Sequence, residues 1–210
     1  MRVADHSGVF IAIEGGDGAG KSTQARLLAR RLRAAGHDVV LTYEPGDTRI
    51  GPDVRRLVLD VASEGLDDRA EALLYAADRA EHVAALIRPA LERGAVVITD
   101  RYVDSSIAYQ GVARGLGADE VAALSGFATG GLLPDLTVVL DVPEDVRRPR
   151  IAGLGDRLER EAAEFHETVR RAYLDRAAGD PGRYLVLDAS QPPDQLAELI
   201  AERVEKVMTG

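Results

Sequence analysis

The sequence predicts an α/β fold in which a five-stranded parallel sheet carries helices on both faces. Five short apolar runs, rich in valine, isoleucine and leucine, alternate along the chain with longer stretches of helical periodicity. No repeat, low-complexity tract or shift of composition interrupts the 210 residues. This alternation is typical of a parallel sheet with crossover helices, so we expect residues 1–210 to form a single domain.

The residues that follow the expected strands are the first candidates for a site. In open α/β sheets, ligands bind at the edge where the carboxyl ends of the strands meet. The expected strands are residues 9–13, 37–42, 95–99, 136–142 and 184–188. The expected helices are residues 22–32, 51–59, 68–93, 103–111, 119–128, 158–177 and 194–207.

Asp67 and Asp68 are expected to cap the longest expected helix, with Glu71 in the capping-box position relative to Asp68. The apolar positions of this helix predict one stripe that faces the core, whereas Tyr75, Arg79 and His82 lie on a different face. Judged by spacing alone, Tyr75 and Arg79 belong to a solvated face with one partly buried ring. The expected core stripe consists of Ala70, Leu73, Leu74, Ala77, Ala84, Ile87 and Leu91.

Composition limits the function. A net charge of −9 argues against a general nucleic-acid or membrane surface, so a bound polyanion must be held by a local cluster of basic residues. With no cysteine the chain has no disulfide and no thiolate metal site, which suits a cytoplasmic enzyme. No signal peptide and no apolar segment of transmembrane length is visible, so we expect neither nucleic acid nor membrane as a partner.

Residues 14–23 read Glu-Gly-Gly-Asp-Gly-Ala-Gly-Lys-Ser-Thr and match the phosphate-binding loop motif G-x-x-x-x-G-K-[ST]. The segment follows an expected strand and opens an expected helix, which directs backbone N–H groups and a helix N-terminus at a polyphosphate. Lys21 is expected to neutralise the outer phosphates, and Ser22 to hold magnesium. The expected nucleoside triphosphate site consists of Gly15, Gly16, Asp17, Gly18, Ala19, Gly20, Lys21, Ser22 and Thr23.

A carboxylate and an arginine, Asp100 and Arg101, come directly after the third expected strand. Downstream of a phosphate-binding loop, such a carboxylate is expected to be the second magnesium anchor, with the arginine in reach of a phosphate. A surface ion pair is the alternative interpretation. If the next segment is helical, one side of it offers rings, a hydroxyl and an amide that suit the edge of a heterocycle. These residues are Tyr102, Ser106, Tyr109 and Gln110.

Residues 144–157 contain four arginines with glycines near them. A run of arginines is usually a solvated helix face. The glycines favour instead a flap that closes over phosphates, and we expect a short arginine-rich lid at about residues 147–158. Pro149 falls where a helix would continue, so the start of the lid is expected to be kinked or shortened. The four arginines are Arg147, Arg148, Arg150 and Arg157.

Taken together, these segments resemble the thymidylate kinase family of nucleoside monophosphate kinases, from residue 11 to about residue 193. The phosphate-binding loop is shared by many enzymes, whereas Asp-Arg-Tyr-Val-Asp-Ser-Ser-Ile-Ala-Tyr-Gln-Gly at residues 100–111 is far more specific. Further segments that carry the resemblance are Glu-Pro-Gly at 44–46 with Gly51 and Arg55, Leu-Tyr-Ala-Ala-Asp-Arg-Ala at 74–80, and Asp-Arg-Leu-Glu at 156–159.

The resemblance implies a P-loop NTPase fold and the reaction ATP + dTMP → ADP + dTDP, with Mg²⁺ near Ser22 and Asp100. It also implies a homodimer. For the thymine base, it implies that Tyr75 stacks on the ring, that Arg79 donates to O4, and that Ser106 and Gln110 complete the base edge.

For the sugar and the phosphates, the resemblance implies that Asp17 lies near the 3′-OH and that Tyr109 lies where a 2′-OH would protrude. Arg55 corresponds to a position near the acceptor phosphate, and Arg101 to the arginine that bridges donor and acceptor phosphates. Ser105 belongs to the same substrate-binding run.

Some members of the family carry a catalytic arginine inside the phosphate-binding loop, and this loop has none. In the bacterial branch with that gap the lid supplies the arginine. Arg157 fits best because its segment matches, while Arg147 and Arg150 are further candidates. The implied catalytic residues are therefore Lys21, Arg101 and Arg157.

The loop at residues 43–47 departs from the family pattern. The branch commonly has arginine before Glu-Pro-Gly-Gly, and here the flanking residues are Tyr43 and Asp47. One positive charge is lost and one negative charge is gained, and Arg49 is a candidate for compensation that spacing alone does not establish.

Two alternatives stay open on the residues alone. One is a small P-loop kinase for another nucleotide or a nucleoside, although Tyr75, Arg79, Ser106 and Gln110 suit a pyrimidine. The other is a P-loop switch ATPase whose output is partner binding. Against it, the chain has no Asn-Lys-x-Asp guanine signature, and the arginine-rich lid suits transfer between two bound nucleotides.

Overall fold

The computed structural model describes residues 7–151 and 155–209. Its centre is a sheet of five parallel strands in the order β2-β3-β1-β4-β5. The predicted fold class is confirmed, and the strand bounds lie within two residues of the expected ones. The strands are β1 (Val9–Glu14), β2 (Val39–Tyr43), β3 (Val96–Asp100), β4 (Leu136–Asp141) and β5 (Tyr184–Asp188).

Helices occupy the stretches between the strands. α3, a π-helical segment (Val83–Ile87) and α4 follow one another without a break, and so form the long helix that the sequence predicted. α5 likewise continues into a π-helical segment at Ile107–Ala113. Among the described residues, no helix is long and apolar enough to span a lipid bilayer. The helices are α1 (Lys21–Ala34), α2 (Gly51–Leu59), α3 (Asp68–His82), α4 (Arg88–Glu92), α5 (Val103–Ser106), α6 (Ala118–Thr129), α7 (Glu144–Arg147), α8 (Ala163–Gly179) and α9 (Pro193–Thr209).

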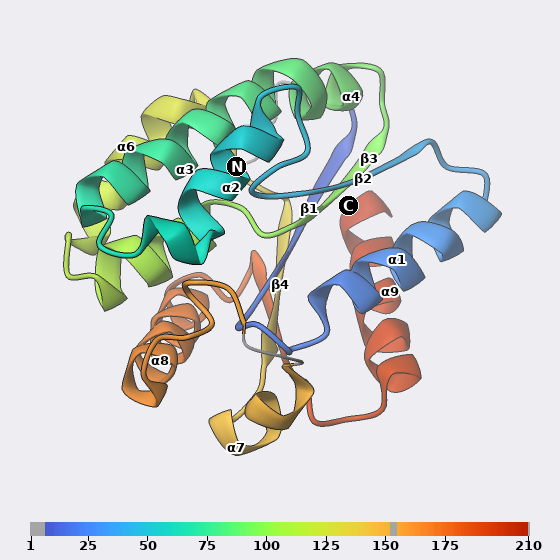
Figure 1. The fold of residues 1–210 in the computed structure, drawn as a ribbon. Coiled ribbons are helices and arrows are strands. Elements are labelled where there is room, and N and C mark those ends of the chain that lie inside the picture. Colours follow the sequence, from blue (N-terminus) through green and yellow to red (C-terminus); the bar gives the residue numbers. More distant parts are fainter. Residues whose placement is uncertain (1–6, 152–154, 210) are drawn as a thin grey trace.

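Side chains of the central strand alternate between two hydrophobic clusters, as expected for a strand covered on both faces. Ile11 joins the cluster of α1 and α9, which lie side by side in Figure 1. Phe10 joins the opposite cluster, which contains Ile87 and Leu91 of the long helix. A third cluster, which includes Val139 of β4 and Val169 of α8, packs under the segment at 107–113.

The strand order places a switch point at β1, because β1 pairs with β3 on one side and with β4 on the other. The chain turns sharply here. Gly15 has φ +134°, and a Cβ at this position would lie 2.5 Å from the carbonyl oxygen of Leu140. Only glycine fits this approach. The phosphate-binding loop therefore leaves β1 close against β4, where ligands of open α/β sheets bind.

The predicted core stripe of the long helix is confirmed at Ile87 and Leu91, which are fully buried, and is wrong in α3. Leu73 is 58% exposed and Ala77 is exposed as well, whereas the polar positions Asp78, Arg79 and His82 are buried. The predicted cap is confirmed at Asp67, which accepts hydrogen bonds from the N–H groups of Arg69 and Ala70. The capping box is wrong, because Glu71 turns inward and is fully buried. The inner face of α3 therefore combines polar side chains with small and aromatic ones, while Leu73 and Ala77 face outward. Apolarity alone therefore does not identify the face that is covered.

The expected lid begins as predicted. α7 ends at Arg147, and a short 3-10 helix, Arg148–Arg150, follows with Pro149 at its centre. Because proline lacks an N–H group and clashes with the preceding turn, the α-helix stops there. Of the expected lid at 147–158, residues 152–154 lie outside the described part of the chain.

Candidate active site

The phosphate-binding loop ends at Gly20, whose left-handed backbone (φ +93°) begins α1. The side chain of Lys21 folds back over the loop, donates to the carbonyl oxygen of Gly16 at 2.9 Å and lies 3.9 Å from an Asp17 carboxylate oxygen. Burial and the nearby charge of Arg101 lower the pKa of Lys21, and Asp17 opposes them. A buried cation over a glycine loop and a helix N-terminus forms a site for a polyphosphate.

Two oxygen-bearing side chains suited to magnesium lie at the edge of this loop. Ser22 Oγ donates to Asp100 Oδ2 at 2.5 Å, across 78 residues of sequence. Parallel pairing sets this contact, because Asp100 lies opposite Ile13 of β1 in the register. A hydroxyl and a carboxylate are hard oxygen donors, and Mg²⁺ in kinases takes only one or two protein ligands beside phosphate oxygens and water. The donor set fits magnesium.

Arg101 follows β3 with φ +74°, a left-handed conformation that is uncommon for residues other than glycine. Its carbonyl oxygen accepts from Thr99 Oγ1 at 2.8 Å, which supports this turn. Nη2 donates to Asp17 Oδ1 at 2.5 Å and Nη1 to Gly15 O at 3.2 Å. Further acceptors are the hydroxyl groups of Ser105, Tyr109 and Tyr173 at 3.0–3.4 Å. Strain of this kind persists where the surroundings fix the residue, which is common at functional sites.

Glu14, which the sequence interpretation did not single out, lies fully buried beneath Arg101. Its carboxyl group accepts from Tyr102 N at 2.8 Å, from Ser105 Oγ at 2.6 Å and from Tyr173 OH at 3.1 Å. Burial, and then the charge of Asp104, raises the pKa of Glu14 to about 7. Only its place, immediately before the glycine loop, hints at this role in the sequence. Glu14 fixes two of the hydroxyl groups that hold Arg101.

Two cavities flank Arg101. The first is lined by most of the expected acceptor-site residues, and the second by Lys21, Ser22 and Asp100. Asp17, Glu44, Arg55 and Arg101 line both. The expected acceptor-site residues that line the first cavity are Asp17, Arg55, Tyr75, Arg101, Ser105, Ser106, Tyr109 and Gln110.

Polar groups of the first cavity are held in place by neighbours. Arg55 Nη1 donates to the carbonyl oxygen of Pro45 at 2.8 Å. Gln110 Nε2 donates to Glu71 Oε1 at 2.8 Å, which orients the amide. Ser106 Oγ is buried and has no hydrogen-bond partner among the described residues. Because buried hydroxyls are normally paired, Ser106 is suited to a ligand atom.

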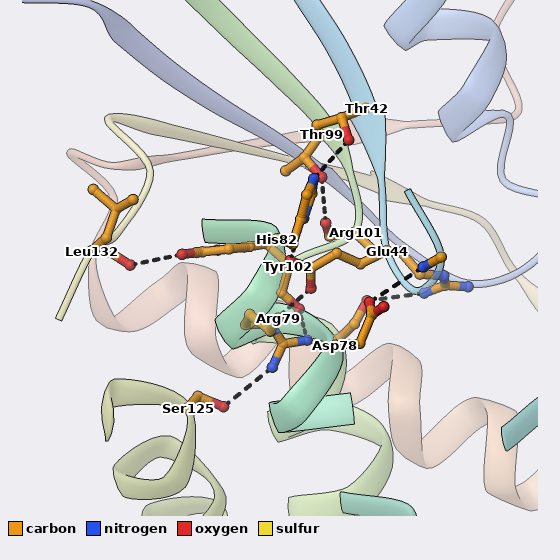
Figure 2. Close-up of polar contacts among 12 residues, drawn as sticks. Thr42, Glu44, Asp78, Arg79, His82, Thr99, Arg101, Tyr102, Ser125 and Leu132 are labelled. Atoms are coloured by element: carbon orange, nitrogen blue, oxygen red, sulfur yellow. Dashed lines mark hydrogen bonds and ion pairs between the residues drawn. The ribbon is translucent and has the colours of Figure 1, made fainter. Parts of the chain in front are cut away.

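Arg79 does not line either cavity in this structure. It is 1% exposed and donates through Nε to Glu44 Oε2 at 2.7 Å and through Nη2 to Tyr102 O at 3.1 Å. Its Nη1 makes a longer contact with Ser125 Oγ, at 3.4 Å. Figure 2 shows the guanidinium between these groups. The N–H groups of Arg79 therefore bind Glu44, Tyr102 and Ser125, and of these acceptors only Glu44 lines the first cavity.

The lid arginines lie in different places. Arg157 is buried in an ion pair with Glu71 and donates twice to the carbonyl oxygen of Val58, at 3.1 and 2.8 Å. It therefore points toward α2 and α3, away from the phosphate-binding loop. Arg150 donates to Ala189 O at 3.0 Å, beyond the end of β5.

Arg147 is the lid arginine that lies against the phosphate-binding loop. A Cβ built on Gly16 would be 3.4 Å from Arg147 Cδ. Arg147 is 5% exposed, and it pairs with both carboxylate oxygens of Glu144, at 2.6 and 3.0 Å. Its Nη1 is buried without a hydrogen-bond partner in the described part of the chain. The arginine run of the sequence contained this residue, but no pattern ranked it above Arg157.

A strand-loop-helix phosphate site beside a second cavity, with one arginine between them, defines a P-loop nucleotide kinase. A family model described as thymidylate kinase matches residues 13–200. The thymidylate kinase of Clavibacter michiganensis subsp. michiganensis is 51% identical over 207 residues, 97% of this chain and 98% of that protein. That of Cutibacterium acnes is 51% identical over 197 residues, with 94% and 96% covered.

A solved structure agrees. Thymidylate kinase from Ehrlichia chaffeensis superposes with a TM-score of 0.75 at 33% identity and covers 96% of this chain and 99% of its own. The chain belongs to the thymidylate kinase family, and its activity is the transfer of the γ-phosphoryl group of ATP to dTMP. The resemblance seen in the sequence is confirmed.

The first prediction concerns Asp78, whose Oδ2 accepts from Gly46 N at 3.2 Å while Oδ1 has no partner among the described residues. Burial, and then the charge of Glu44, raises the pKa of Asp78 to about 6. The folded protein thus holds the proton more tightly than the unfolded chain, and this stabilisation is lost as the pH rises through about 6.

Asp78→Asn carries no charge to bury, so its free energy of unfolding should not fall in this way. From pH 5 to pH 8, the free energy of unfolding of the variant minus that of the wild type should therefore increase by roughly 1 kcal/mol. Urea unfolding of both proteins at the two pH values measures this difference. A difference that stays constant, or that falls toward pH 8, would contradict the raised pKa.

Proposed function

We propose that ATP and dTMP occupy the two cavities on either side of Arg101 and that this guanidinium contacts both phosphate groups. The observation that carries the proposal is that Arg101 lines both cavities. Phosphoryl transfer to an acceptor that is already an anionic phosphate needs mainly positioning and charge neutralisation. A guanidinium fixed by Asp17 and Gly15 meets both needs.

On the donor side, the loop from Gly15 to Thr23 would bind the phosphates of ATP through backbone N–H groups, with Lys21 on the outer phosphates. Ser22 and Asp100 would hold Mg²⁺, whose charge neutralises the phosphate oxygens when it is bound. Their contact at 2.5 Å supports a shared task.

On the acceptor side, Tyr75 would stack on thymine, and the unpaired hydroxyl of Ser106 and the oriented amide of Gln110 would contact the base edge. Tyr109 would lie against C2′ of the sugar, and Asp17 near the 3′-OH. Arg55 would bind the acceptor phosphate. All of these residues line the first cavity, which supports the assignment.

Arg79 would reach O4 of thymine by exchanging its long contact with Ser125 for the base. Its hydrogen bonds to Glu44 and Tyr102 are compatible with that exchange because a guanidinium has five N–H donors. Ser105, which supports Arg101, would act on the substrate through that arginine.

We infer that Arg147, and not Arg157, supplies the lid's catalytic charge. Arg147 is buried against Gly16 and has an Nη1 without a partner in the described residues. Arg157 would first have to leave Glu71 in a buried environment, which is costly because it separates two desolvated charges.

A homodimer is a further proposal, supported by the outer faces of α3 and α6. Leu73 is 58% exposed on α3, and Phe127 is 89% exposed on α6, which packs against α3. Exposed apolar residues on neighbouring helices are typical of protein interfaces. A cytoplasmic location is also proposed, because both substrates are charged nucleotides that do not cross membranes unaided.

The function is tested by measuring ADP formation with dTMP, dUMP, UMP, CMP and dCMP and without an acceptor. We expect the highest kcat/KM with dTMP, little ADP without an acceptor, and loss of activity when EDTA removes Mg²⁺. Arg101→Ala should lower kcat by about 10³-fold, because it removes a charge at the transferred phosphate. ADP release that does not depend on an acceptor would indicate a switch ATPase instead.

The lid assignment is tested by Arg147→Ala and Arg157→Ala, with Arg148→Ala as an exposed control. Arg147→Ala should lower kcat by about 10³-fold with little change in stability, the loss expected of a catalytic arginine. Arg157→Ala should lower the free energy of unfolding by about 3 kcal/mol, because it leaves the buried Glu71 with only the longer ion pair to Arg114, at 3.6 Å. A large loss of kcat in Arg157→Ala at unchanged stability would restore Arg157 as the catalytic residue.

The dimer is tested with Phe127→Asp, and with Leu199→Asp on α9 as a control that is also a partly exposed apolar residue. Light scattering should give twice the monomer mass for the wild type and for Leu199→Asp, and the monomer mass for Phe127→Asp. A monomeric wild type, or a Phe127→Asp protein that stays dimeric, would refute this interface.

A further inference from the structure

A chain of hydrogen bonds runs through the interior next to the acceptor cavity. His82, fully buried on α3, lies between Thr42 Oγ1 at 2.6 Å from Nε2 and Glu44 Oε1 at 2.9 Å from Nδ1. Figure 2 shows the imidazole ring between these two groups. Thr42 Oγ1 is also 2.7 Å from Asp47 Oδ2, and Glu44 Oε2 accepts from Arg79.

Counting protons along this chain decides the state of the imidazole. Thr42 has one hydroxyl hydrogen, and the carboxylate of Asp47 can only accept it. Thr42 therefore accepts from His82 Nε2. At the other end, Nδ1 faces the Glu44 carboxylate and must donate as well. Both ring nitrogens carry a proton, so the buried ring is an imidazolium.

The charges around the ring agree with this count. Glu44 and Asp47 face it from the segment after β2, and Asp78 and Arg79 are near it on its own helix. Burial alone would raise the pKa of Glu44, but the charge of Arg79 and the hydrogen bond from His82 outweigh it and lower that pKa. A second cation brings the charge of this group nearer to neutrality, as burial demands.

The segment that His82 holds forms one wall of the first cavity. Glu44 and Pro45 line it, and Pro45 O holds the guanidinium of Arg55. Gly46 N is bound by Asp78. Any displacement of Glu44 therefore moves the arginine proposed for the acceptor phosphate.

We propose that His82 is a positioning residue for dTMP: as a buried imidazolium that bridges Thr42 and Glu44, it fixes the loop at residues 44–47 and, through it, Arg55. The role of Arg55 is part of the proposed function, whereas the charge of His82 is independent of it.

Asp47 is what makes the ring a cation. Without a carboxylate at residue 47, Thr42 would be free to donate to Nε2 of a neutral ring. Here the carboxylate of Asp47 accepts the hydroxyl hydrogen of Thr42. The extra negative charge at residue 47 is thus answered by a proton on His82, and not by the nearby Arg49.

The charge is tested by ¹⁵N NMR of the imidazole nitrogens in the full chain, with His82→Gln to assign the signals and exposed His37 as the internal reference. We expect both nitrogens of His82 to carry a proton at neutral pH. In Asp47→Ala the hydroxyl hydrogen of Thr42 has no carboxylate to bind and is free to be donated to Nε2, so that ring nitrogen should be bare at the same pH. A ring with one bare nitrogen at pH 7 in the wild type would overturn the proposal, even if His82→Gln does not fold.

The positioning role is tested by kinetics of His82→Gln, with His37→Gln as the control. His82→Gln should raise KM for dTMP about tenfold, the cost of roughly one charge-assisted hydrogen bond, and change kcat and KM for ATP less than threefold. An unchanged KM for dTMP, or equal rises for both substrates, would overturn the role. Absence of dTMP kinase activity in the wild type would refute the proposed function separately.

Discussion

One guanidinium, that of Arg101, is held by acceptors from three parts of the chain that meet only because the sheet brings them together. Gly15 and Asp17 come from the loop after β1, Ser105 and Tyr109 from the helix after β3, and Tyr173 from α8. The register of β1 with β3 places Asp100 opposite Ile13, so Arg101 leaves β3 beside the point where the phosphate-binding loop leaves β1. A rigid arginine costs little reorganisation when charge develops beside it, which is why such fixing serves catalysis.

The same edge of the sheet explains why α3 buries charged side chains and exposes Leu73. Its inner side bears Glu71, Asp78, Arg79 and His82, each matched by a partner of opposite charge or by a hydrogen-bonding neighbour. Buried ion pairs of this sort contribute little net stability, because desolvation offsets their attraction. The stability of the fold must come from the three apolar clusters around β1 and β4, and the polar face of α3 serves the site.

The sequence predicted the fold and the position of the phosphate-binding loop well because both depend on local patterns. Apolar runs and helical periodicity identified the strands and helices, and a motif of fixed spacing identified the phosphate-binding loop. The inward face of α3 was predicted wrongly, because periodicity reports apolar residues and not which side a neighbour covers. Glu14 and Tyr173 could not be predicted as partners, since 159 residues separate them and nothing local marks their contact.

The arginines show this limit most clearly. A buried guanidinium takes its position from its carboxylate, and those carboxylates lie 35 residues away for Arg79, 84 for Arg101 and 86 for Arg157. Arg147 is the exception, since Glu144 is one helical turn before it. A short-range partner ties Arg147 to α7, so its ion pair depends on no residue outside that helix. Arg157 is tied instead to Glu71 of α3, and a movement away from α3 would break a buried ion pair. This difference is the physical reason for proposing Arg147 as the catalytic arginine.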